Sequence, residues 1–371
     1  MVEILSCLNL TYVAVHMRRW WLRRTFLPSR RCAWACVAAV LLIPSTIAPP
    51  GRLAVIRRAQ VWRQTGVAAF DFKAGHEGIA PWSTVACDYV NKPLGGNTPK
   101  FACRLPSGET VKVKYGADNG EVYAGVAASR LLRALGFGAD VMQPVRVDCR
   151  GCPARPGGRR IATNTFRFDV AAIEQKTKGH DVPGITDRGW RWSELDLVDP
   201  QAGGAARGQR DALELLAVFL QHTDNKPEQQ RLVCPGRSTA ASSCEQPLLM
   251  IHDVGQTFGA ANLLNRSAVG SVNLAMWSAT PVWKDETQCV GNLARSLTGN
   301  LYDPRISEEG RKFLADLLVQ LSDAQLHDLF DVAHFADGPA RMRPPEGKNT
   351  IDAWVDAFKR KRADIVRARC P

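Results

Sequence analysis

The sequence HTDNKPEQ at residues 222–229, together with its flanking segments, decides the expected fold. Apolar residues recur at three- and four-residue steps through residues 211–221, which predicts a helix leading into this polar stretch. Two short apolar runs follow, and the second, at residues 248–251, ends at D-V-G in residues 253–255. The expected order is therefore helix, polar loop, strand, turn and strand, with an aspartate in each of the two polar motifs.

The two motifs resemble the catalytic loop and the metal-binding turn of protein kinases, H-R-D-x-K-x-x-N and D-F-G. The resemblance implies that Asp224 orients the attacking hydroxyl, that Lys226 lies beside the transferred phosphate, and that Asp253 holds a metal ion. Gln229 stands where the family has its metal-binding Asn, and Asn225 is the alternative ligand. Each motif alone is common loop chemistry, so the interpretation depends on their order and on the elements around them.

The preceding part of the chain predicts a lobe that binds nucleotide. Its first three expected strands, by alternation of apolar residues, are residues 83–90, 100–105 and 110–115. The loop between the first two contains Gly95 and Gly96, whose backbone N–H groups can approach phosphates closely. The simpler alternative is that these two glycines only form a turn.

The sequence VKVK at residues 111–114 resembles the V-A-I-K strand of kinases, with Lys114 in the position that binds the α- and β-phosphates. Lys112 lies two residues earlier on the same strand face and is the alternative. Residues 121–136 resemble a helix of atypical kinases, namely phosphoinositide, bacterial toxin-type and secretory-pathway kinases. That resemblance implies that Glu121 pairs with Lys114. The simpler alternatives are a solvated strand face and an acidic residue favoured by a helix N-terminus.

The resemblance implies an α+β, bilobal kinase-like fold with a small, mostly β N-lobe and a mostly helical C-lobe. Strands at 141–147 and 165–173 complete the small lobe, and helices are expected at 307–320, 322–335 and 351–369. The expected domains are a leader (1–48), a linker (49–79), a nucleotide-binding N-lobe (80–176), an irregular insertion (177–208) and a C-lobe with the catalytic loop (209–371). No A-P-E motif follows residue 259, which favours the atypical branch.

The first 48 residues have the pattern of an export signal. Arginines concentrate in residues 18–31, and the apolar run at residues 32–48 is followed by small residues and prolines. This run is short for a membrane span, which needs roughly 20 residues. We expect either a cleaved signal peptide or an uncleaved N-terminal anchor, and contact with a membrane only through this segment if it is retained.

Cysteine usage agrees with an exported protein, periplasmic or secreted. Beyond the leader the chain has eight cysteines, an even number. Their spacing favours four disulfide bonds: Cys87–Cys103, Cys149–Cys152, Cys234–Cys244 and Cys289–Cys370. A zinc site at Cys149 and Cys152 is the rival interpretation, but no second pair of ligands stands at zinc spacing.

Composition limits the partners. The formal net charge is +12, which suits anionic ligands such as nucleotides. We expect no nucleic-acid partner, because no arginine-rich tract carries interleaved aromatic residues. The resemblance implies an ATP- and Mg²⁺-dependent phosphotransferase that acts on a hydroxyl of a protein, lipid or sugar, and the leader and cysteines add that it is exported. The alternatives are a pseudokinase, which binds without phosphotransfer, and an exported binding protein of unrelated fold.

Overall fold

The computed structural model has a mixed α+β fold, as expected at the level of fold class. The residues described are 50–371 without Asn97, 154–163, 184–188, 236–243, 245, 260–271, 297–298 and 339–348. The expected leader lies outside the described residues, as does most of the segment between the expected strands at 141–147 and 165–173 and most of the segment between the two apolar runs that precede residue 253. None of the described helices has both the length and the apolar character needed to cross a lipid bilayer.

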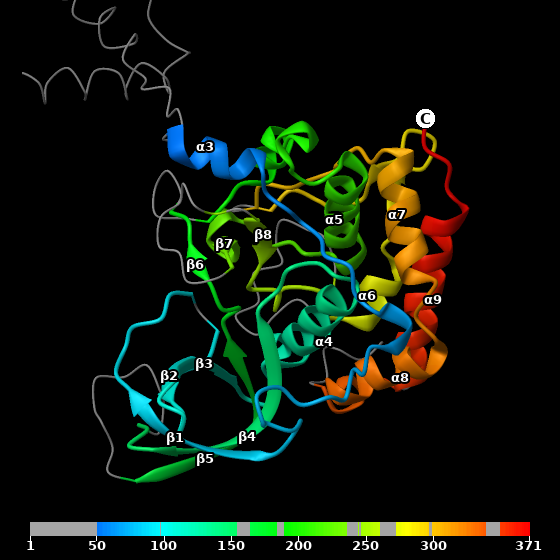
Figure 1. Ribbon diagram of the computed structural model, residues 1–371. Coiled ribbons are helices and arrows are strands. Elements are labelled where there is room, and N and C mark those ends of the chain that lie inside the picture. Colours follow the sequence, from blue (N-terminus) through cyan, green and yellow to red (C-terminus); the bar gives the residue numbers. More distant parts are fainter. Residues whose placement is uncertain are drawn as a thin grey trace, which may run out of the picture. The chain divides into compact units, whose positions relative to one another are not determined.

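Five strands form the sheet that carries part of the candidate site (Figure 1). They are β1 (Thr84–Val90), β2 (Lys100–Arg104), β3 (Thr110–Tyr115), β4 (Val141–Arg150) and β5 (Thr165–Gln175). Every neighbouring pair is antiparallel except β1 and β4, whose parallel pairing closes the sheet into a barrel of order β1-β2-β3-β5-β4. The sequence predicts the five strands but not the closure, because pairing between distant strands leaves no local pattern.

Helix α4 (Gly120–Ala134) packs against β4 and supplies one side of the candidate site. It begins where the Asn119 side chain accepts a hydrogen bond of 3.1 Å from the backbone N–H of Glu121, which is N-cap chemistry. It is followed by Gly136, whose φ is +87°; a Cβ there would lie 2.1 Å from the backbone oxygen of Arg63. The helix is thus fixed at both ends, and its residues are almost all buried.

Five further described helices pack around a large core that also contains the apolar residues of α4. They are α5 (Arg207–Leu220), α6 (Leu274–Ala279), α7 (Glu308–Leu318), α8 (Asp323–Val332) and α9 (Ile351–Arg367). Helix α5 packs on α7, and α8 on α9, as Figure 1 shows. The core between them contains Trp277, Phe330 and Trp354, all fully buried. Each of the four longer helices corresponds to one predicted from the sequence, since each has an amphipathic pattern and two begin at a capping Ser.

A three-stranded sheet includes the two strands that lie between α5 and the second aspartate motif, and one strand that precedes α5. They are β6 (His180–Asp181), β7 (Gln230–Cys234) and β8 (Leu248–Ile251), in the order β6-β7-β8. Strands β7 and β8 pair antiparallel, with Gln230 opposite Ile251. A separate two-stranded ladder joins β9 (Trp283–Asp285) and β10 (Val290–Gly291). The expected sequence of helix, polar loop, strand and strand is therefore present around residues 222–255.

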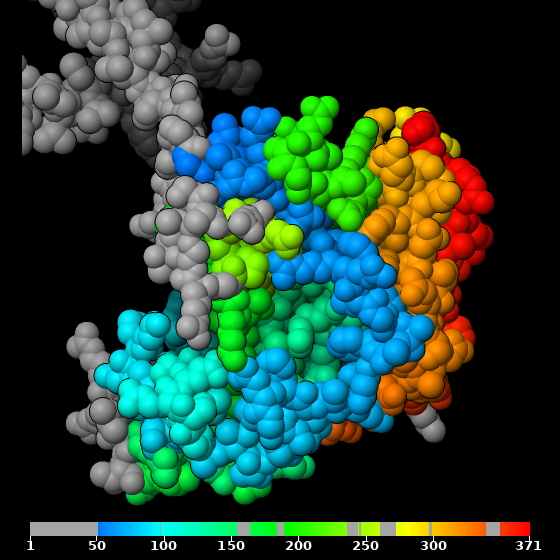
Figure 2. All heavy atoms as spheres, viewed as in Figure 1, coloured from blue at the N-terminus to red at the C-terminus, as the bar shows by residue number. Residues whose placement is uncertain are grey.

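The segment expected to be a linker, residues 49–79, is instead part of the packed structure. It begins with α3 (Pro50–Arg57), and Val55, Ile56 and Val61 are fully buried. The rest of this segment runs across the face drawn in Figure 2, in blue, and reaches α8, where Gln325 donates hydrogen bonds to two of its carbonyls. Its apolar residues are unevenly spaced and follow neither a helix nor a strand period throughout, so the sequence pattern did not reveal their burial.

The expected irregular insertion, residues 177–208, also packs inward. Trp190 and Trp192 are buried, and each indole N–H donates a 3.0 Å hydrogen bond to a backbone carbonyl, of Met250 and of Asn225 respectively. Arg52 of α3 forms a buried ion pair with Glu194 at 2.9 Å. The two tryptophans therefore anchor this segment to β8 and to the loop at residues 222–229, and they do not form an exposed binding surface.

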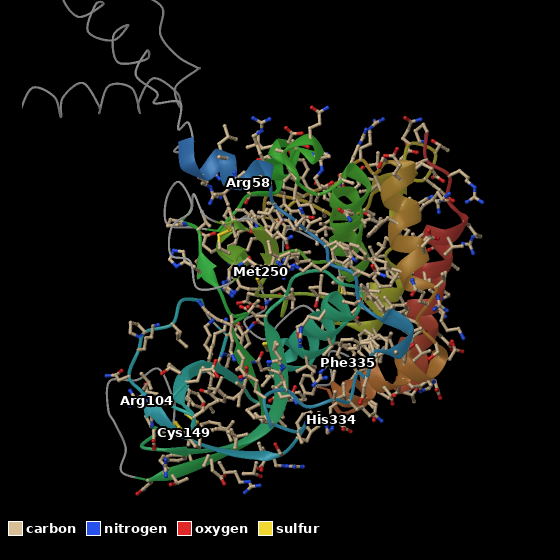
Figure 3. All side chains as sticks on the ribbon, in the orientation of Figure 1. Arg58, Arg104, Cys149, Met250, His334 and Phe335 are labelled. Carbon is tan, nitrogen blue, oxygen red and sulfur yellow. A yellow bond between two sulfur atoms is a disulfide. The ribbon has the colours of Figure 1, made fainter. Side chains whose placement is uncertain are left out.

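All four expected disulfide bonds are present. The bonded pairs are Cys87–Cys103, Cys149–Cys152, Cys234–Cys244 and Cys289–Cys370. The first two lie side by side in the barrel core, with the sulfur atoms of Cys103 and Cys149 3.9 Å apart; Cys149 is labelled in Figure 3. This pairing leaves no free thiol for a zinc site at Cys149 and Cys152, and it is consistent with an extracellular protein.

Candidate functional site

Lys114 is the centre of the candidate site. It lies on β3, with its side chain only 1% exposed. Its ammonium nitrogen is 2.8 Å from Glu121 Oε2 and 2.7 Å from Asp253 Oδ1. Glu121 is in the first turn of α4, and Asp253 follows β8, so three separate elements converge on one cation. Met250, labelled in Figure 3, marks the strand that delivers Asp253.

The electrostatics of this contact favour full ionisation. Burial by itself lowers the pKa of Lys114, but the carboxylates of Asp253 and Glu121 outweigh it and raise that pKa above its ordinary value. For the carboxyl group of Asp253, burial by itself raises the pKa, but the ammonium groups of Lys114 and Lys112 hold that pKa well below its ordinary range. At neutral pH the site therefore carries an ammonium group between two carboxylates, shielded from water.

Glu121 is held in place by two further side chains. Thr98 Oγ1 and Gln256 Nε2 both donate to its Oε1, at 2.6 and 2.7 Å. Gly255 makes this approach possible, since a Cβ there would lie 2.8 Å from Glu121 Cβ and 2.9 Å from Oε2. The glycine of the D-V-G motif is thus required for the close packing of Glu121 against the turn after β8.

The glycine loop between β1 and β2 reaches the site through its far end. Thr98, which contacts Glu121, follows Gly95 and Gly96 in this loop. Gly96 has a φ of +82°, a conformation that favours glycine, whereas a Cβ at Gly95 would meet no atom within 4 Å. The structure thus explains Gly96 as a turn residue and shows that the loop ends over the charged cluster.

The catalytic-loop motif forms a second polar group. Helix α5 is followed by Gln221 in the left-handed conformation, and the chain then turns away. Lys226 Nζ lies 2.8 and 2.9 Å from the two oxygens of Asp224. The side chain of Gln229, at the end of a 3₁₀ turn, donates from Nε2 to Asp224 Oδ2 at 2.8 Å. Two of the residues singled out by the motif, Lys226 and Gln229, therefore both contact the third, Asp224.

This loop is tied to the segment that carries Asp253. The backbone oxygen of Gln229 accepts a 3.0 Å hydrogen bond from the backbone N–H of His252. His222 connects the two motifs electrostatically: burial lowers its pKa to about 4, against the attraction of both Asp224 and Asp253. The loop of the first motif and the segment of the second are thus joined directly by the backbone hydrogen bond between Gln229 and His252.

The side chain of Asn225 binds backbone groups and does not face the charged cluster around Lys114. Its Nδ2 donates to the backbone oxygens of His222 and Leu301, and its Oδ1 accepts from the backbone N–H groups of Asn300 and Leu301. These four bonds use its amide fully, and the residue is 1% exposed. The expectation that Asn225 substitutes as a metal ligand therefore disagrees with its geometry, because no lone pair is left to face an ion.

Lys112 also belongs to the cluster. It lies opposite Glu174 in the pairing of β3 with β5, and its Nζ is 2.6 Å from Glu174 Oε2. The same nitrogen is 3.5 Å from Asp253 Oδ2. Asp253 thus has one lysine close to each of its oxygens, and Glu174 is the second carboxylate of Lys112.

The sequence did not identify Thr98, Glu174 or Gln256 as site residues. Gln256 stands one residue beyond the D-V-G motif, and Glu174 lies near the end of the expected N-lobe and is paired with Lys112 between β3 and β5. Strand register alone would have indicated Glu174, because residues paired across strands share one face. Thr98 has no such signal, since its contact depends on the path of an irregular loop.

The oxygen donors of the site fit a hard divalent cation. Asp253 offers a carboxylate at the end of a strand, and Gln229 offers an amide oxygen while its Nε2 is bound to Asp224. Mg²⁺ prefers such oxygen ligands and keeps several waters. Lys114 and Lys112 are the cations available for anionic groups bound beside that metal.

Comparison with known proteins adds little. No protein-family model matches the chain, and no curated protein matches it. Among solved structures, one match is the crystal structure of a Helicobacter pylori proinflammatory kinase, CtkA. The TM-score is 0.42 and the identity 9%, over 76% of this chain and 93% of that chain. A similarity this low assigns no function, so only the residues of the site can indicate one.

Proposed function

We propose that this protein is an exported, bilobal kinase-like phosphotransferase that moves the γ-phosphate of ATP to a hydroxyl acceptor. One observation carries the proposal: Lys114 Nζ contacts both Glu121 Oε2, at 2.8 Å, and Asp253 Oδ1, at 2.7 Å. A strand lysine, a helix glutamate and the aspartate of an Asp-x-Gly turn are the three charged groups that kinases place around the nucleotide phosphates. Here they meet in a buried position, which solvated surface charges do not do.

Each residue has a role in this proposal. Lys114, oriented by Glu121, binds the α- and β-phosphates. Asp253 and Gln229 hold Mg²⁺, which when bound supplies charge neutralisation at the phosphates. Asp224 orients the acceptor hydroxyl and accepts its proton, since a carboxylate with both oxygens already hydrogen-bonded is fixed in direction.

Lys226 and Lys112 complete the charge arrangement. Lys226 bridges both oxygens of Asp224 and is 29% exposed, so it is accessible to a transferred phosphate. Lys112, between Glu174 and Asp253, supplies a second cation beside Lys114. Gly95 and Gly96 stay in the proposal only as the turn that brings Thr98 over Glu121.

The second candidate is a pseudokinase, a binding module without phosphotransfer. The specific observation in its favour is the hydrogen bonding of Asn225, which removes it as a metal ligand. Gln229 is then the second metal ligand left from the motif, and its longer arm displaces the ion from the position that an Asn would give. Binding of nucleotide without transfer is the result that this candidate requires.

Export is part of the proposal because of the disulfide bonds. Four bonded pairs are typical of proteins whose disulfides form in an oxidising compartment, such as a periplasm or the exterior of the cell. ATP is scarce in such places. The phosphotransferase would therefore act where ATP is imported or inside a host cell, and its acceptor hydroxyl belongs to a protein, a lipid or a sugar.

The test is thermal unfolding of the full oxidised chain with and without Mg²⁺-ATP. Ligand at about 100 times its dissociation constant should stabilise the wild type by roughly 2.7 kcal/mol. The variant Asp253→Asn should lose this effect, whereas Asp169→Asn, at a position with 72% side-chain exposure, should keep it. No stabilisation with any nucleotide and metal would refute nucleotide binding.

Transfer of labelled phosphate then separates the two candidates. The enzyme should label an acceptor or itself, and Asp224→Asn should abolish labelling while stabilisation by Mg²⁺-ATP remains. Stabilisation without labelling in the wild type, across protein, lipid and sugar acceptors, would favour the pseudokinase.

A further inference from the structure

A second cluster of ionisable side chains lies next to the proposed nucleotide site. Asp140 precedes β4, Glu174 lies near the end of β5, and His252 follows β8. One ligand atom from each of them lies within 4.8 Å of the other two. Asp140 and Glu174 are buried, and the side chain of His252 is 16% exposed. Three segments far apart in the sequence thus bring two carboxylates and an imidazole together.

In each carboxylate, the oxygen that faces away from His252 contacts other groups of the protein. Asp140 Oδ1 accepts hydrogen bonds of 2.7 Å from the backbone N–H of Thr177 and from Arg231 Nη1. Glu174 Oε2 is 2.6 Å from Lys112 Nζ, an ion-pair contact that lacks hydrogen-bond geometry. These contacts orient both carboxylates and direct their remaining oxygens toward His252.

The imidazole is oriented in the same way. His252 Nε2 is 2.7 Å from the backbone oxygen of Glu228, and a carbonyl only accepts, so Nε2 carries the hydrogen. Nδ1 then points at the carboxylates, 3.9 Å from Asp140 Oδ2 and 3.8 Å from Glu174 Oε1. A histidine that donates one ring N–H to a backbone carbonyl and presents the other nitrogen to a shared centre is typical of metal ligands.

Two of the three inward atoms have no hydrogen-bond partner among the described residues. Within the described part of the chain, neither Asp140 Oδ2 nor His252 Nδ1 has a hydrogen-bond partner, although both atoms are buried. Buried polar atoms are rarely left unpaired, because each costs about 1–3 kcal/mol. A bare nitrogen lone pair facing two carboxylate oxygens is also repulsive. Both problems disappear when a cation lies between the three atoms.

We propose that Asp140, Glu174 and His252 bind a divalent transition metal of the zinc type. Ligand bonds of about 2.0–2.2 Å to one ion separate neighbouring ligand atoms by about 3–4 Å, which agrees with the distances of 3.8 and 3.9 Å. An imidazolium in direct contact with a carboxylate would instead lie about 2.7–2.9 Å from it. The nitrogen ligand favours zinc-like metals over Mg²⁺ or Ca²⁺, which prefer oxygen ligands.

This site does not depend on nucleotide binding and stands if the proposed function is wrong. It adjoins the phosphate site through Lys112, which lies between Glu174 and Asp253. A cation bound by Glu174 would weaken the ion pair between Glu174 and Lys112. The lysine would then be freer to pair with Asp253 or with a phosphate.

The test is direct metal binding by the full chain with its disulfides intact, freed of metal by chelator and titrated with Zn²⁺ alone. We expect one tightly bound Zn²⁺ per chain. His252→Gln should weaken binding about 100-fold or more, since even loss of an outer-shell partner costs 10–100-fold. His327→Gln is the matched control: this histidine is 3.3 Å from Asp352 but exposed, and its loss should leave binding unchanged.

Two further measurements make the outcome decisive. Asp253→Asn should keep Zn²⁺ binding even if it loses Mg²⁺-ATP, which separates failure of this site from failure of the proposed function. Replacement by Co²⁺ should give visible absorption without a sulfur charge-transfer band, excluding the cysteines as ligands. Absence of stoichiometric Zn²⁺ binding by the wild type, or unchanged binding by a folded His252→Gln variant, would overturn the proposal.

Discussion

Replacing Lys114 by methionine should destabilise the fold far more than removing a surface lysine with the same number of carboxylate partners. The Lys114 side chain is 1% exposed and lies 2.7–2.8 Å from Asp253 and Glu121. Methionine has a similar length but no charge, so it fills the space, leaves Glu121 buried without its cation, and leaves Asp253 with Lys112 alone, at 3.5 Å. Removing one partner of a buried ion pair costs about 3–5 kcal/mol.

Lys73 provides the matched control. Its Nζ is 2.9 Å from both Asp328 and Asp331, but its side chain is 49% exposed. Surface ion pairs contribute about 0–1 kcal/mol, because water replaces the lost partner. Lys73→Met should therefore change the free energy of unfolding by no more than about 1 kcal/mol, as measured by urea unfolding at pH 7.

The effect of Lys114→Met should also depend on pH. In the wild type the pKa of Asp253 lies well below its ordinary value, so its stabilising contribution is present at neutral pH and is lost as pH falls through the folded-state pKa. In the variant only Lys112 remains to oppose the effect of burial, so the pKa of Asp253 is higher than in the wild type, and acid relieves the less compensated charge. The difference between variant and wild type should therefore be smaller at pH 4.5 than at pH 7.

Two results would refute this reasoning. The first is an equal loss of unfolding free energy in Lys114→Met and Lys73→Met. The second is a large loss in Lys114→Met that stays the same from pH 7 to pH 4.5. The latter would mean that the lysine acts through packing of its carbon chain and not through its charge.

Three other predictions concern separate parts of the molecule. Gly255→Ala places a Cβ 2.8 Å from Glu121 Cβ, so Glu121 must move, and the Kd for Mg²⁺-ATP should rise at least about tenfold in calorimetry. Burial raises the pKa of the Glu214 carboxyl to about 8, so its contribution to stability is complete below pH 4.5 and is lost as pH rises through 8. The free energy of unfolding in urea should therefore fall between these pH values in the wild type and fall less in Glu214→Gln. Replacing Cys289 and Cys370 by serine opens a loop of 81 residues and should lower the unfolding free energy by about 4.5 kcal/mol in urea.

The sequence could predict those parts of the site that depend on local patterns. Lys114 and Glu121 are seven residues apart, on an alternating strand and in the first turn of a capped helix, so their meeting follows from short-range structure. The motif residues Asp224, Lys226 and Gln229 are within five residues of one another, and their contacts are likewise local.

The parts that sequence analysis missed depend on contacts between distant segments. The side chain of Asn225 accepts a hydrogen bond from the backbone of Leu301, 76 residues away, and no motif spacing reveals such a contact. Asp140, Glu174 and His252 each look ordinary in their own segments and form a group only when β4, β5 and β8 are assembled. The fold class was predictable from pattern and spacing, whereas the barrel closure and the packing of residues 50–79 were not.

The disulfide bonds have a consequence for how the chain comes apart when it is cut. Two of them close within residues 87–152, and the other two lie beyond residue 233. No bond between the described cysteines crosses the segment from Gly179 to Val233, so a single protease cut there would release two fragments on a non-reducing gel. Lys114 would then be on one fragment and Asp253 on the other, and mixing the fragments under native conditions would measure how strongly the halves of the site hold together without a covalent link.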